Sequence, residues 1–373
     1  MTKTRVTTIM GTRPELIRLS QIIKKLDSLF EHRLVHTGQN SDSKLSTVFF
    51  KELKIRKPDL QLEALNSSLG EFLGKLLPAI EIEFNDNPPD AVLILGDTNS
   101  TLAAIIAKRR GIPVYHLEAG NRSFDQNVPE EINRRIVDHF ADFNLAYTSN
   151  AKENLLREGI HPRSIAVVGS PLCEVLTYFE NEINSSNVLN SLKIESGRYF
   201  LVSAHRQENI DSSDRLGELI ESLNGLALEY KIPIIISTHP RIKSKIKLIK
   251  IKLEPQLVFL DPFGFTDYCK LQKESRVVLS DSGSLAEESV ILGFRAATIR
   301  DSMERHEALE SGSVVMAGIK KEGVLDAIKI IESGARSKFP PNEYLISDTS
   351  TRVVNFIAST IPQHRFWSGL RRK

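Results

Sequence analysis

Short apolar runs alternate with longer amphipathic segments along most of this sequence, and the alternation occurs as two separate sets. The first set has runs that are typical of buried strands at residues 6–10, 33–36, 91–95 and 114–116. After the first run, Pro14 opens a segment in which Leu16, Leu19 and Ile22 recur at helical spacing. Such alternation of strand and helix predicts a parallel sheet that is covered by helices on both faces.

The second set begins near Tyr199 and has runs at residues 200–204, 233–237, 257–260, 276–280 and 296–299. Together the two sets predict two doubly wound α/β domains that face each other across a central cleft. The turn-rich triplet Gly169-Ser170-Pro171 favours a boundary between domains of residues 1–170 and 171–373. A final helix is predicted over residues 350–361, and the pattern leaves open whether it packs back on the first domain.

The composition is that of a globular protein without a strong charge bias. The 373 residues are enough for two domains of ordinary size, and 41% are hydrophobic. The 49 basic and 47 acidic side chains nearly cancel, so nothing favours nucleic acid as a partner. Cys173 and Cys269 form no CxxC pair, which argues against a zinc site or a disulfide framework. The sequence has neither a signal peptide nor a run of about 20 apolar residues, so we expect a cytoplasmic protein without stable membrane insertion.

Polar residues gather where the predicted strands end. In open α/β sheets, ligands bind beyond the carboxyl ends of the strands. Six clusters occupy such positions, at residues 11–15, 96–100, 116–120, 204–206, 238–241 and 281–284. They predict one ligand site in the cleft between the two domains.

Two of these clusters have the features of anion sites. In the turn Gly11-Thr12-Arg13-Pro14, a helix N-terminus and the fork of Arg13 suit a diphosphate, although the sequence is neither a Walker A loop nor GxGxxG. In the second cluster, Ser282 and the amides of Gly283 and Ser284 stand at a helix start. Ser284 and Glu287 have capping-box spacing, and Glu288 lies one turn in, where it suits the hydroxyls of a ribose. The alternatives are an ordinary turn and a well-capped helix.

Residues 116–138 carry the densest polar groups of the sequence, among them Glu118, Arg122 and Glu130. A solvated loop followed by a charged helix start explains most of them, but not Glu118, which directly follows a buried strand. No DxD, HExxH or His/Cys cluster is present, so no metal is expected. Among the histidines at strand ends are His205 and His239, and the charged neighbours of His205 favour a functional role for it.

Taken together, these motifs resemble those of the UDP-N-acetylglucosamine 2-epimerase family. The matching stretches are residues 11–15, 96–98, 116–120, 129–134, 205–208 and 281–288. The resemblance implies a GT-B fold of two Rossmann-like domains, an isomerase that needs no cofactor, a UDP-linked 2-acetamido sugar as partner, and a homodimer.

Within this family the sequence looks most like one branch of capsule and O-antigen synthesis. That branch converts UDP-2-acetamido-2,6-dideoxy-L-talose into UDP-N-acetyl-L-fucosamine. The segments 118–126, 136–139 and 299–307 support the assignment. Arg18 and Asn121 also stand where the wider family has lysine and leucine.

The chemistry of such a substrate limits the mechanism. The hydrogen on C2 of an amino sugar is not acidic, because no neighbouring carbonyl stabilises a carbanion. The simplest route is elimination, in which a base removes the C2 proton while UDP leaves C1. UDP then returns to the 2-acetamidoglycal as a proton reaches the other face. Proton transfer on two faces needs at least two acid/base groups.

The resemblance gives roles to particular residues. The family positions for proton transfer are Asp97, Glu118 and Glu130, without a decision about which serves which face. Donors aimed at the departing diphosphate stabilise its developing charge. Those donors are Arg13, His205, Ser282 and the amides of Gly283 and Ser284, with Glu288 on the ribose and Arg18, Arg122 and His239 as further ligand contacts.

Four other interpretations stay open. The enzyme could act on UDP-N-acetylglucosamine and UDP-N-acetylmannosamine by the same mechanism, or it could let water capture the glycal. A GT-B glycosyltransferase would pass the sugar to an acceptor, and a sensor would only bind it. The carboxylates at the strand ends favour an epimerase over the last two.

Overall fold

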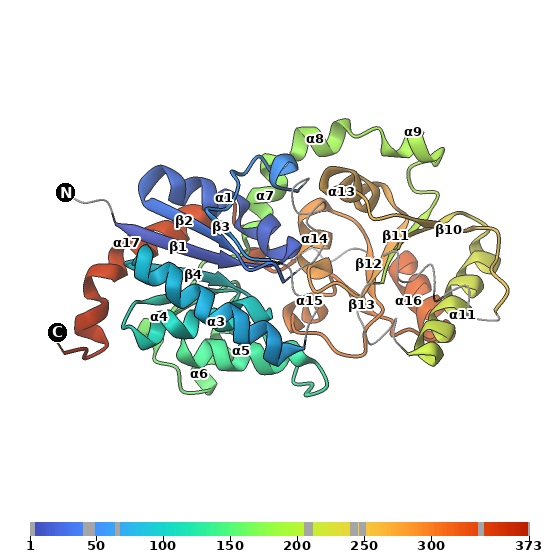
Figure 1. Ribbon diagram of the computed structural model, residues 1–373. Helices are drawn as coiled ribbons and strands as arrows, with labels where there is room; N and C mark the ends of the chain where they lie inside the picture. The colour runs from blue at the N-terminus through green and yellow to red at the C-terminus, as the bar shows by residue number, and fades with distance from the viewer. Residues whose placement is uncertain are drawn as a thin grey trace. The chain divides into compact units, whose positions relative to one another are not determined.

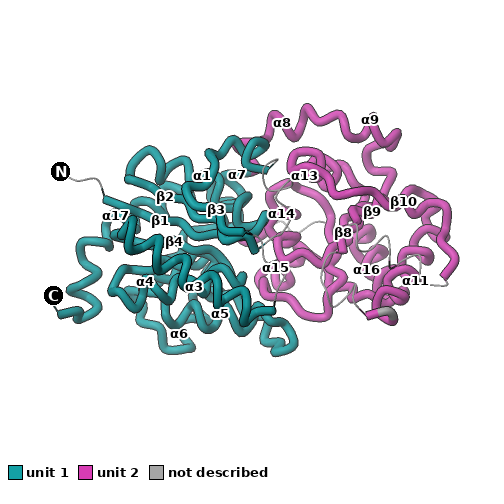
Figure 2. Tube along the Cα trace, in the orientation of Figure 1, with its two compact units in different colours: residues 1–175, 343–373 teal, residues 176–342 magenta. Residues whose placement is uncertain are grey.

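The computed structural model describes residues 4–39, 49–63, 68–204, 212–238, 245, 251–334 and 339–371. The chain forms two compact units, which Figure 2 distinguishes by colour. Unit 1 consists of residues 1–175 and 343–373, and unit 2 of residues 176–342. The boundary expected after residue 170 falls at the start of helix α7 (Pro171–Tyr178), and the last helix, α17 (Thr349–Trp367), belongs to unit 1.

Unit 1 is built on a seven-stranded parallel sheet in the order β3-β2-β1-β4-β5-β6-β7. Its strands are β1 (Arg5–Met10), β2 (Glu31–His36), β3 (Leu60–Gln61), β4 (Ala91–Leu95), β5 (Val114–Leu117), β6 (Phe143–Ala146) and β7 (Ile165–Val167). The chain winds outward in one direction from β1 and in the other from β4. The loops that follow these two neighbouring strands therefore diverge, and they leave a crevice in which such sheets bind ligands.

Helices cover both faces of this sheet (Figure 1). One layer is formed by α3 (Leu69–Asp86), η1 (Asn99–Ala104), α4 (Ile105–Arg109) and α5 (Pro129–Phe140). The other contains α1 (Arg13–Leu29), which packs along α17. The Tyr115 hydroxyl of β5 lies 2.7 Å from Thr360 Oγ1, so α17 is tied to the sheet itself. Unit 1 also has α6 (Ser149–Arg157), η2 (Pro162–Ser164) and most of η3 (Asn342–Leu345).

Unit 2 repeats the plan with a six-stranded parallel sheet in the order β10-β9-β8-β11-β12-β13. Its strands are β8 (Phe200–Ser203), β9 (Ile234–Ser237), β10 (Leu257–Leu260), β11 (Val277–Ser280), β12 (Ala296–Thr298) and β13 (Val315–Met316). Its helices are α8 (Glu180–Ser185), α9 (Val188–Leu192), α11 (Ser213–Tyr230), α13 (Phe265–Glu274), α14 (Leu285–Leu292), α15 (His306–Glu310) and α16 (Lys321–Ser333). Helices α11 and α16 pack together over β8, β9 and β11 and form its core.

The expected fold class, two doubly wound α/β units, is confirmed. All nine strands expected from apolar runs are present. The sequence did not predict β3, β6, β7 or β13. Of these, β3 and β13 have two residues each, and the buried Asn144 interrupts the apolar run of β6. In the described part of the chain no helix is long and apolar enough to cross a membrane.

Gly120 offers a direct test of the packing that follows β5. It has a φ of +85°, and a Cβ there would lie 2.2 Å from the Ala151 carbonyl oxygen. Because that oxygen belongs to the backbone, we expect Gly120→Ala to cost about 3 kcal/mol or more and to lower the Tm of unit 1 by roughly 6–12 °C. Gly159 has the same φ but open space around it, so Gly159→Ala should cost only about 1–2 kcal/mol. Equal losses in calorimetry would contradict this account.

Candidate active site

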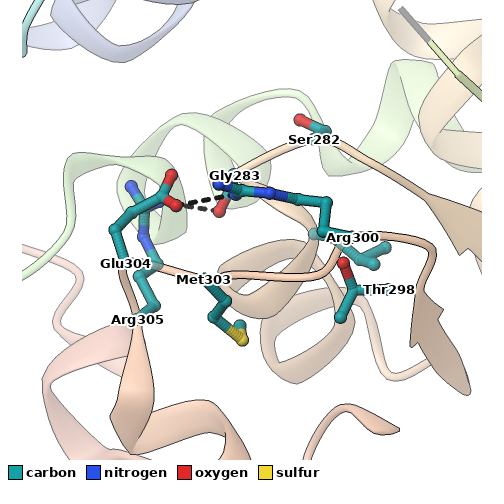
Figure 3. A pocket seen from close by; sticks show the side chains of 8 residues that line it. Ser282, Gly283, Thr298, Arg300, Met303, Glu304 and Arg305 are labelled. Atoms are coloured by element: carbon teal, nitrogen blue, oxygen red, sulfur yellow. Dashed lines mark hydrogen bonds and ion pairs between the residues drawn. The ribbon is translucent and has the colours of Figure 1, made fainter. Parts of the chain in front are cut away.

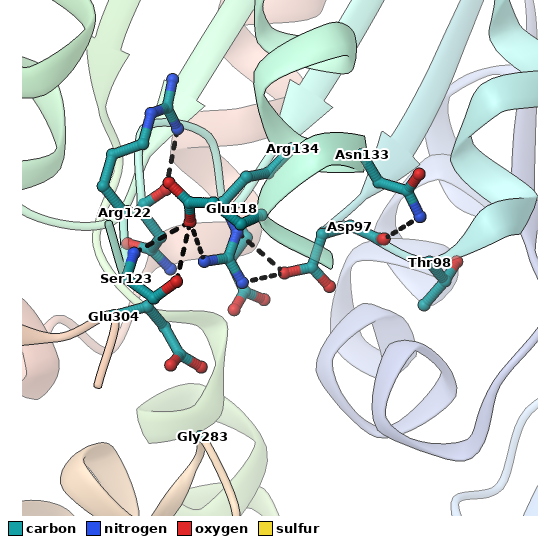
Figure 4. Close-up of polar contacts among 12 residues, drawn as sticks. Asp97, Thr98, Glu118, Arg122, Ser123, Asn133, Arg134, Gly283 and Glu304 are labelled. Carbon is teal, nitrogen blue, oxygen red and sulfur yellow. Dashed lines mark hydrogen bonds and ion pairs between the residues drawn. The ribbon is translucent and has the colours of Figure 1, made fainter. Parts of the chain in front are cut away.

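The loops after β1, β4 and β5 meet at the carboxyl edge of the unit 1 sheet, because these three strands are neighbours. They carry Arg13, Asp97 and Glu118, three of the residues expected to act on the ligand. A Cβ on Gly96 would lie 3.9 Å from Oε2 of Glu118, so the Glu118 carboxylate lies beside the backbone that precedes Asp97. The structure therefore brings the two carboxylates to one edge (Figure 4).

Glu15, in the first turn of α1, joins the β1 loop to the β4 loop. One carboxylate oxygen accepts hydrogen bonds from the amides of Gly11 and Thr12, both at 2.7 Å. The other accepts one from the Thr98 hydroxyl at 2.7 Å. Burial raises the pKa of Glu15 to about 7, although the hydrogen bonds from Gly11 and Thr98 lower it. No role was predicted for Glu15, and in the structure its buried carboxylate holds the two loops together.

Arg13 follows this turn at the first position of α1. Its guanidinium carbon lies 4.0 Å from the centroid of the Phe49 ring, so the aromatic face fixes the direction of the fork. The turn itself requires a glycine at position 11, because a Cβ there would lie 2.1 Å from Thr37 Oγ1 and 2.2 Å from Ser100 Oγ. Arg13 thus stands at the positive end of a 17-residue helix, an arrangement that suits an anion.

Glu118 has a φ of +70°, a conformation that residues other than glycine rarely adopt. Its Oε2 lies 3.7 Å from Nη1 of the buried Arg18, and the side chain is 16% exposed. The Arg18 guanidinium in turn lies 5.5 Å from the centroid of the Tyr147 ring. Backbone strain of this kind costs about 1–3 kcal/mol and is concentrated at functional residues. Arg18, expected near the ligand, directly contacts the strained carboxylate.

Helix α5 holds Asp97. Nε and Nη2 of Arg134 donate to Oδ2 of Asp97 at 3.1 and 2.5 Å, and Nδ2 of Asn133 donates to the Asp97 carbonyl at 3.0 Å (Figure 4). The Asp97 side chain is 29% exposed. The carboxylate is therefore oriented by an arginine and still accessible from one side.

The structure distinguishes the two glutamates at the start of α5. Glu130, the expected acid/base group, is exposed. Glu131 is buried, accepts a hydrogen bond from the Ser123 amide at 2.9 Å and pairs with Arg134 at 2.8 Å. Burial alone would raise the pKa of Glu131, but the Ser123 amide and the Arg134 charge lower it below its usual value. Glu131 thus anchors the loop before α5, and the role of Glu130 stays a prediction.

Arg122 requires a correction, because it was expected near the sugar or phosphate. Its side chain is fully buried. Nη1 lies 2.7 Å from Oδ2 of Asp138, and Nε and Nη2 donate to both oxygens of Glu158 at 2.8 and 2.6 Å. Since protein carboxylates occupy its fork, we assign Arg122 to the interior of unit 1 and not to the ligand.

In unit 2, the start of α14 and helix α13 hold Glu288 from two sides. The Ser284 hydroxyl donates to Oε1 of Glu288 at 2.8 Å, and Nε2 of Gln272 donates to Oε2 at 2.5 Å. Despite the capping-box spacing of Ser284 and Glu287, the Ser284 hydroxyl binds Glu288, and Glu287 pairs with Arg305 at 3.1 Å. Glu288 is thereby oriented near the carboxyl end of β11, where a contact with a ribose was predicted.

Arg300, which was not predicted as a site residue, lines a small pocket beside the same helix start (Figure 3). The side chain is buried, and its Nη1 donates to Oε2 of Glu304 at 2.6 Å. Nε and Nη2 are buried without a hydrogen-bond partner among the described residues. The Glu304 carboxylate packs against Gly283, since a Cβ on Gly283 would lie 2.5 Å from its Oε1. The position of Arg300 just after β12 is the sequence feature that could have identified it as a site residue.

The comparisons with known proteins agree with these features. A family model described as UDP-N-acetylglucosamine 2-epimerase matches residues 24–358. The chain belongs to this family. It is thus a UDP-sugar 2-epimerase, an isomerase, and its two doubly wound units are the GT-B-like arrangement of the family.

Solved structures and sequence relatives extend over nearly the whole epimerase. The UDP-N-acetylglucosamine 2-epimerase of Rickettsia bellii is 40% identical, with 97% of this chain and 98% of that chain covered and a TM-score of 0.90. The enzyme of Methanocaldococcus jannaschii, solved with UDP-GlcNAc and UDP, is 34% identical, with 95% and 100% covered and a TM-score of 0.89. A Pseudomonas aeruginosa relative, UDP-2,3-diacetamido-2,3-dideoxy-D-glucuronate 2-epimerase, is 34% identical, with 95% and 99% covered.

Two expected site residues of this epimerase, His205 and His239, lie outside the described residues. Across the part of the chain that the structure describes, no group of three or more His, Cys, Asp or Glu side chains could hold a metal ion.

The buried Glu15 gives the epimerase a pH dependence of stability with a defined sign. Because its pKa rises from 4.5 to about 7 on folding, its contribution is fully present below pH 4.5 and is lost as the pH rises through 7. We expect the free energy of unfolding to fall by about 3 kcal/mol more in the wild type than in Glu15→Gln between pH 4.5 and 7.5. Urea unfolding at several pH values measures this, and parallel pH profiles of the two proteins would rule it out.

Proposed function

We propose that this chain inverts C2 of a UDP-linked 2-acetamido sugar without hydrolysis, with UDP-N-acetylglucosamine and UDP-N-acetylmannosamine as its substrate pair. The observation that carries the proposal is the placement of Asp97 and Glu118 after adjacent strands. Each carboxylate is ion-paired with an arginine, Asp97 with Arg134 and Glu118 with Arg18. Two oriented acid/base groups at one sheet edge meet the need for proton transfer on both faces of C2.

The proposed reaction balances without a redox partner. A carboxylate takes the C2 proton, the electron pair of the C–H bond forms the C1–C2 double bond, and UDP leaves C1 with the electron pair of the C–O bond. UDP then adds back to C1 while the other group delivers a proton to the opposite face of C2. Glu130 remains a third candidate for this proton transfer. His205 is the proposed hydrogen-bond donor to the leaving diphosphate.

In this proposal unit 2 binds the nucleotide. Glu288, held by Ser284 and Gln272, accepts hydrogen bonds from the ribose hydroxyls. The Gly283 and Ser284 amides and the Ser282 hydroxyl bind the diphosphate, which is typical of a helix start. Arg300 joins them, because two of its buried donors lack a partner among the described residues and a phosphate oxygen supplies an acceptor. Arg13 and His239 stay predicted ligand contacts.

The choice of sugar rests on the names of the relatives. Both solved structures compared above are UDP-N-acetylglucosamine 2-epimerases. The second candidate is UDP-2-acetamido-2,6-dideoxy-L-talose, and one observation favours it. Arg18, where the wider family has lysine, contacts Glu118 itself, so the departure falls at a proposed acid/base group. A homodimer, a cytoplasmic location and a role in capsule or O-antigen synthesis remain proposals that rest on the resemblance.

The deciding experiment is NMR of C2 in D₂O, with no metal or NAD added. Deuterium at C2 with a UDP-linked N-acetylmannosamine product from UDP-N-acetylglucosamine supports the proposal. Exchange and inversion only with the 6-deoxy-L-talo sugar would move the enzyme to the second candidate. Free sugar plus UDP would indicate a hydrolysing epimerase. No exchange with either sugar, while UDP binds, would indicate a glycosyltransferase or a sensor.

The carboxylates give a specific mutational test. Asp97→Asn and Glu118→Gln should each lower kcat by about 10²-fold or more, because an amide cannot exchange a proton with C2. The affinity for UDP, measured by calorimetry, should stay within about threefold. Glu153→Gln, which alters an exposed ion pair with Arg157 on the same unit, is the matched control and should keep full activity. Full activity in both site variants would remove these residues from the mechanism.

Arg300 gives a separate test of nucleotide binding. Arg300→Met should weaken UDP binding by roughly 10- to 100-fold, since hydrogen bonds to charged groups are worth about 1.5–3 kcal/mol. The double variant with Glu304→Gln removes the ion pair as a unit. The control is Arg276→Met, which breaks the pair with Glu332 at the surface of unit 2. Unchanged UDP affinity in both Arg300 variants would exclude the contact.

A further inference from the structure

Four buried or half-buried charged residues, here called the charged cluster, lie directly beneath the Asp97 and Glu118 loops. The charged cluster runs from His116 through Asp138 and Arg122 to Glu158. Nδ1 of His116 lies 2.8 Å from Oδ1 of Asp138, and Arg122 bridges Oδ2 of Asp138 to Glu158. The side chains of the first three residues are fully buried, so none of them meets a ligand or solvent. The mechanism proposed above gives this charged cluster no role.

The hydrogen bonds at both ends of the His116 ring fix its orientation. Nε2 lies 2.7 Å from the Gly96 carbonyl, which can only accept, so Nε2 carries a proton. Asp138 also accepts from Arg122 and from the Gly120 amide, which favours its ionised form, and its pKa is lowered by the His116 and Arg122 contacts despite its burial. The His116 ring is thus held between the Gly96 carbonyl and the Asp138 carboxylate, with a contact at each nitrogen.

The same contacts tie together the two loops that carry the acid/base groups. Through His116, Asp138 reaches the carbonyl of Gly96, the residue before Asp97. Through its other oxygen, it holds the Gly120 amide at 3.1 Å, two residues after Glu118. Glu118 therefore lies between two anchored positions, His116 and Gly120, and its φ of +70° is imposed from both sides.

From this geometry we infer that Asp138, acting through His116 and the Gly120 amide, is a positioning residue that sets the placement of Asp97 and Glu118 for C2 proton transfer. The inference rests on the proposed function, because it assigns the consequence to those two carboxylates. A shift of about 1 Å in a reacting group can lower the rate about 10²-fold. A fixed backbone beneath both loops prevents such a shift and thereby maintains the rate.

The chain contains a matched control for this inference. Asp142 is also a nearly buried carboxylate in unit 1 that binds a histidine, a cation and a backbone amide. Its partners are His364 at 3.0 Å, Lys108 at 2.7 Å and the Val114 amide at 3.0 Å. Val114, whose amide binds Asp142, begins β5, whereas Glu118 follows the end of that strand. Asp142 therefore stabilises the same sheet at a place away from the site.

The experiment compares Asp138→Ala, Asp138→Asn and Asp142→Ala with the wild type. For each protein it measures kcat, KM, UDP affinity, deuterium exchange at C2 of UDP-N-acetylglucosamine, and Tm. We expect both alanine variants to lower Tm, but only Asp138→Ala to lower kcat and C2 exchange by about 10²-fold. UDP affinity should stay within about threefold. Asp138→Asn can keep the hydrogen bonds to Gly120, Arg122 and His116, so it should recover at least tenfold of the lost kcat.

Other results would overturn the inference. Asp138→Ala with kcat within about threefold of Asp142→Ala would mean that Asp138 only stabilises the fold. If alanine at 138 prevents folding, His116→Phe fills the ring volume, removes both hydrogen bonds and should give the same loss of kcat. A wild type inactive on every sugar tested would sink the proposed function. Crystal structures of the variants would still decide the positioning, because an unmoved Glu118 with positive φ in Asp138→Ala contradicts it.

Discussion

The attachment of helix α5 to the loops after β4 and β5 is the constraint on which the rest of unit 1 depends. One face of this helix presents Asn133, Arg134 and Asp138 to the ends of the two strands. Asn133 and Arg134 hold Asp97, while Asp138 holds Gly120 and, through His116, Gly96. The helix begins at Pro129, and Glu131 in its first turn secures the preceding loop through Ser123. One helix thus sets the separation of two carboxylates that come from different strands.

Such an arrangement cannot be explained by stability alone. Burying charges costs several kcal/mol per ion, and apolar residues of similar volume often replace an ion pair without loss. In unit 1 the loops that carry Asp97 and Glu118 are held by hydrogen-bonded ion pairs, such as Arg134 with Asp97 or Arg122 with Glu158. What these pairs supply is direction, because bidentate and hydrogen-bonded contacts fix both distance and angle. The strained backbone of Glu118 is the position at which that direction is needed, since strain persists only where the surroundings impose it.

The sequence predicted the fold well because the strands that matter are unbroken apolar runs with turn residues at their ends. It also placed Asp97, Glu118 and Arg13 correctly at strand ends, since the polar residue after a buried strand is a local signal. The prediction failed for Arg122. No local sequence feature distinguishes an arginine that binds phosphate from an arginine whose guanidinium is held by two carboxylates. One of these two carboxylates, that of Glu158, lies 36 residues away in the sequence. Asp138 was missed for the same reason, as its importance depends on contacts across the fold, whereas Arg300 had a local signal in its position just after β12.

Arg300 and Glu304 in unit 2 illustrate how a site can be organised before its ligand arrives. The Glu304 carboxylate lies against Gly283 at the start of α14 and accepts a hydrogen bond from Arg300. A helix start and an arginine both favour a negative charge, so a resident carboxylate keeps the arginine oriented towards the helix. It leaves two donors of Arg300 without a partner among the described residues. A diphosphate that supplied their acceptors would gain contacts that the carboxylate does not make, without first paying to reorient the arginine.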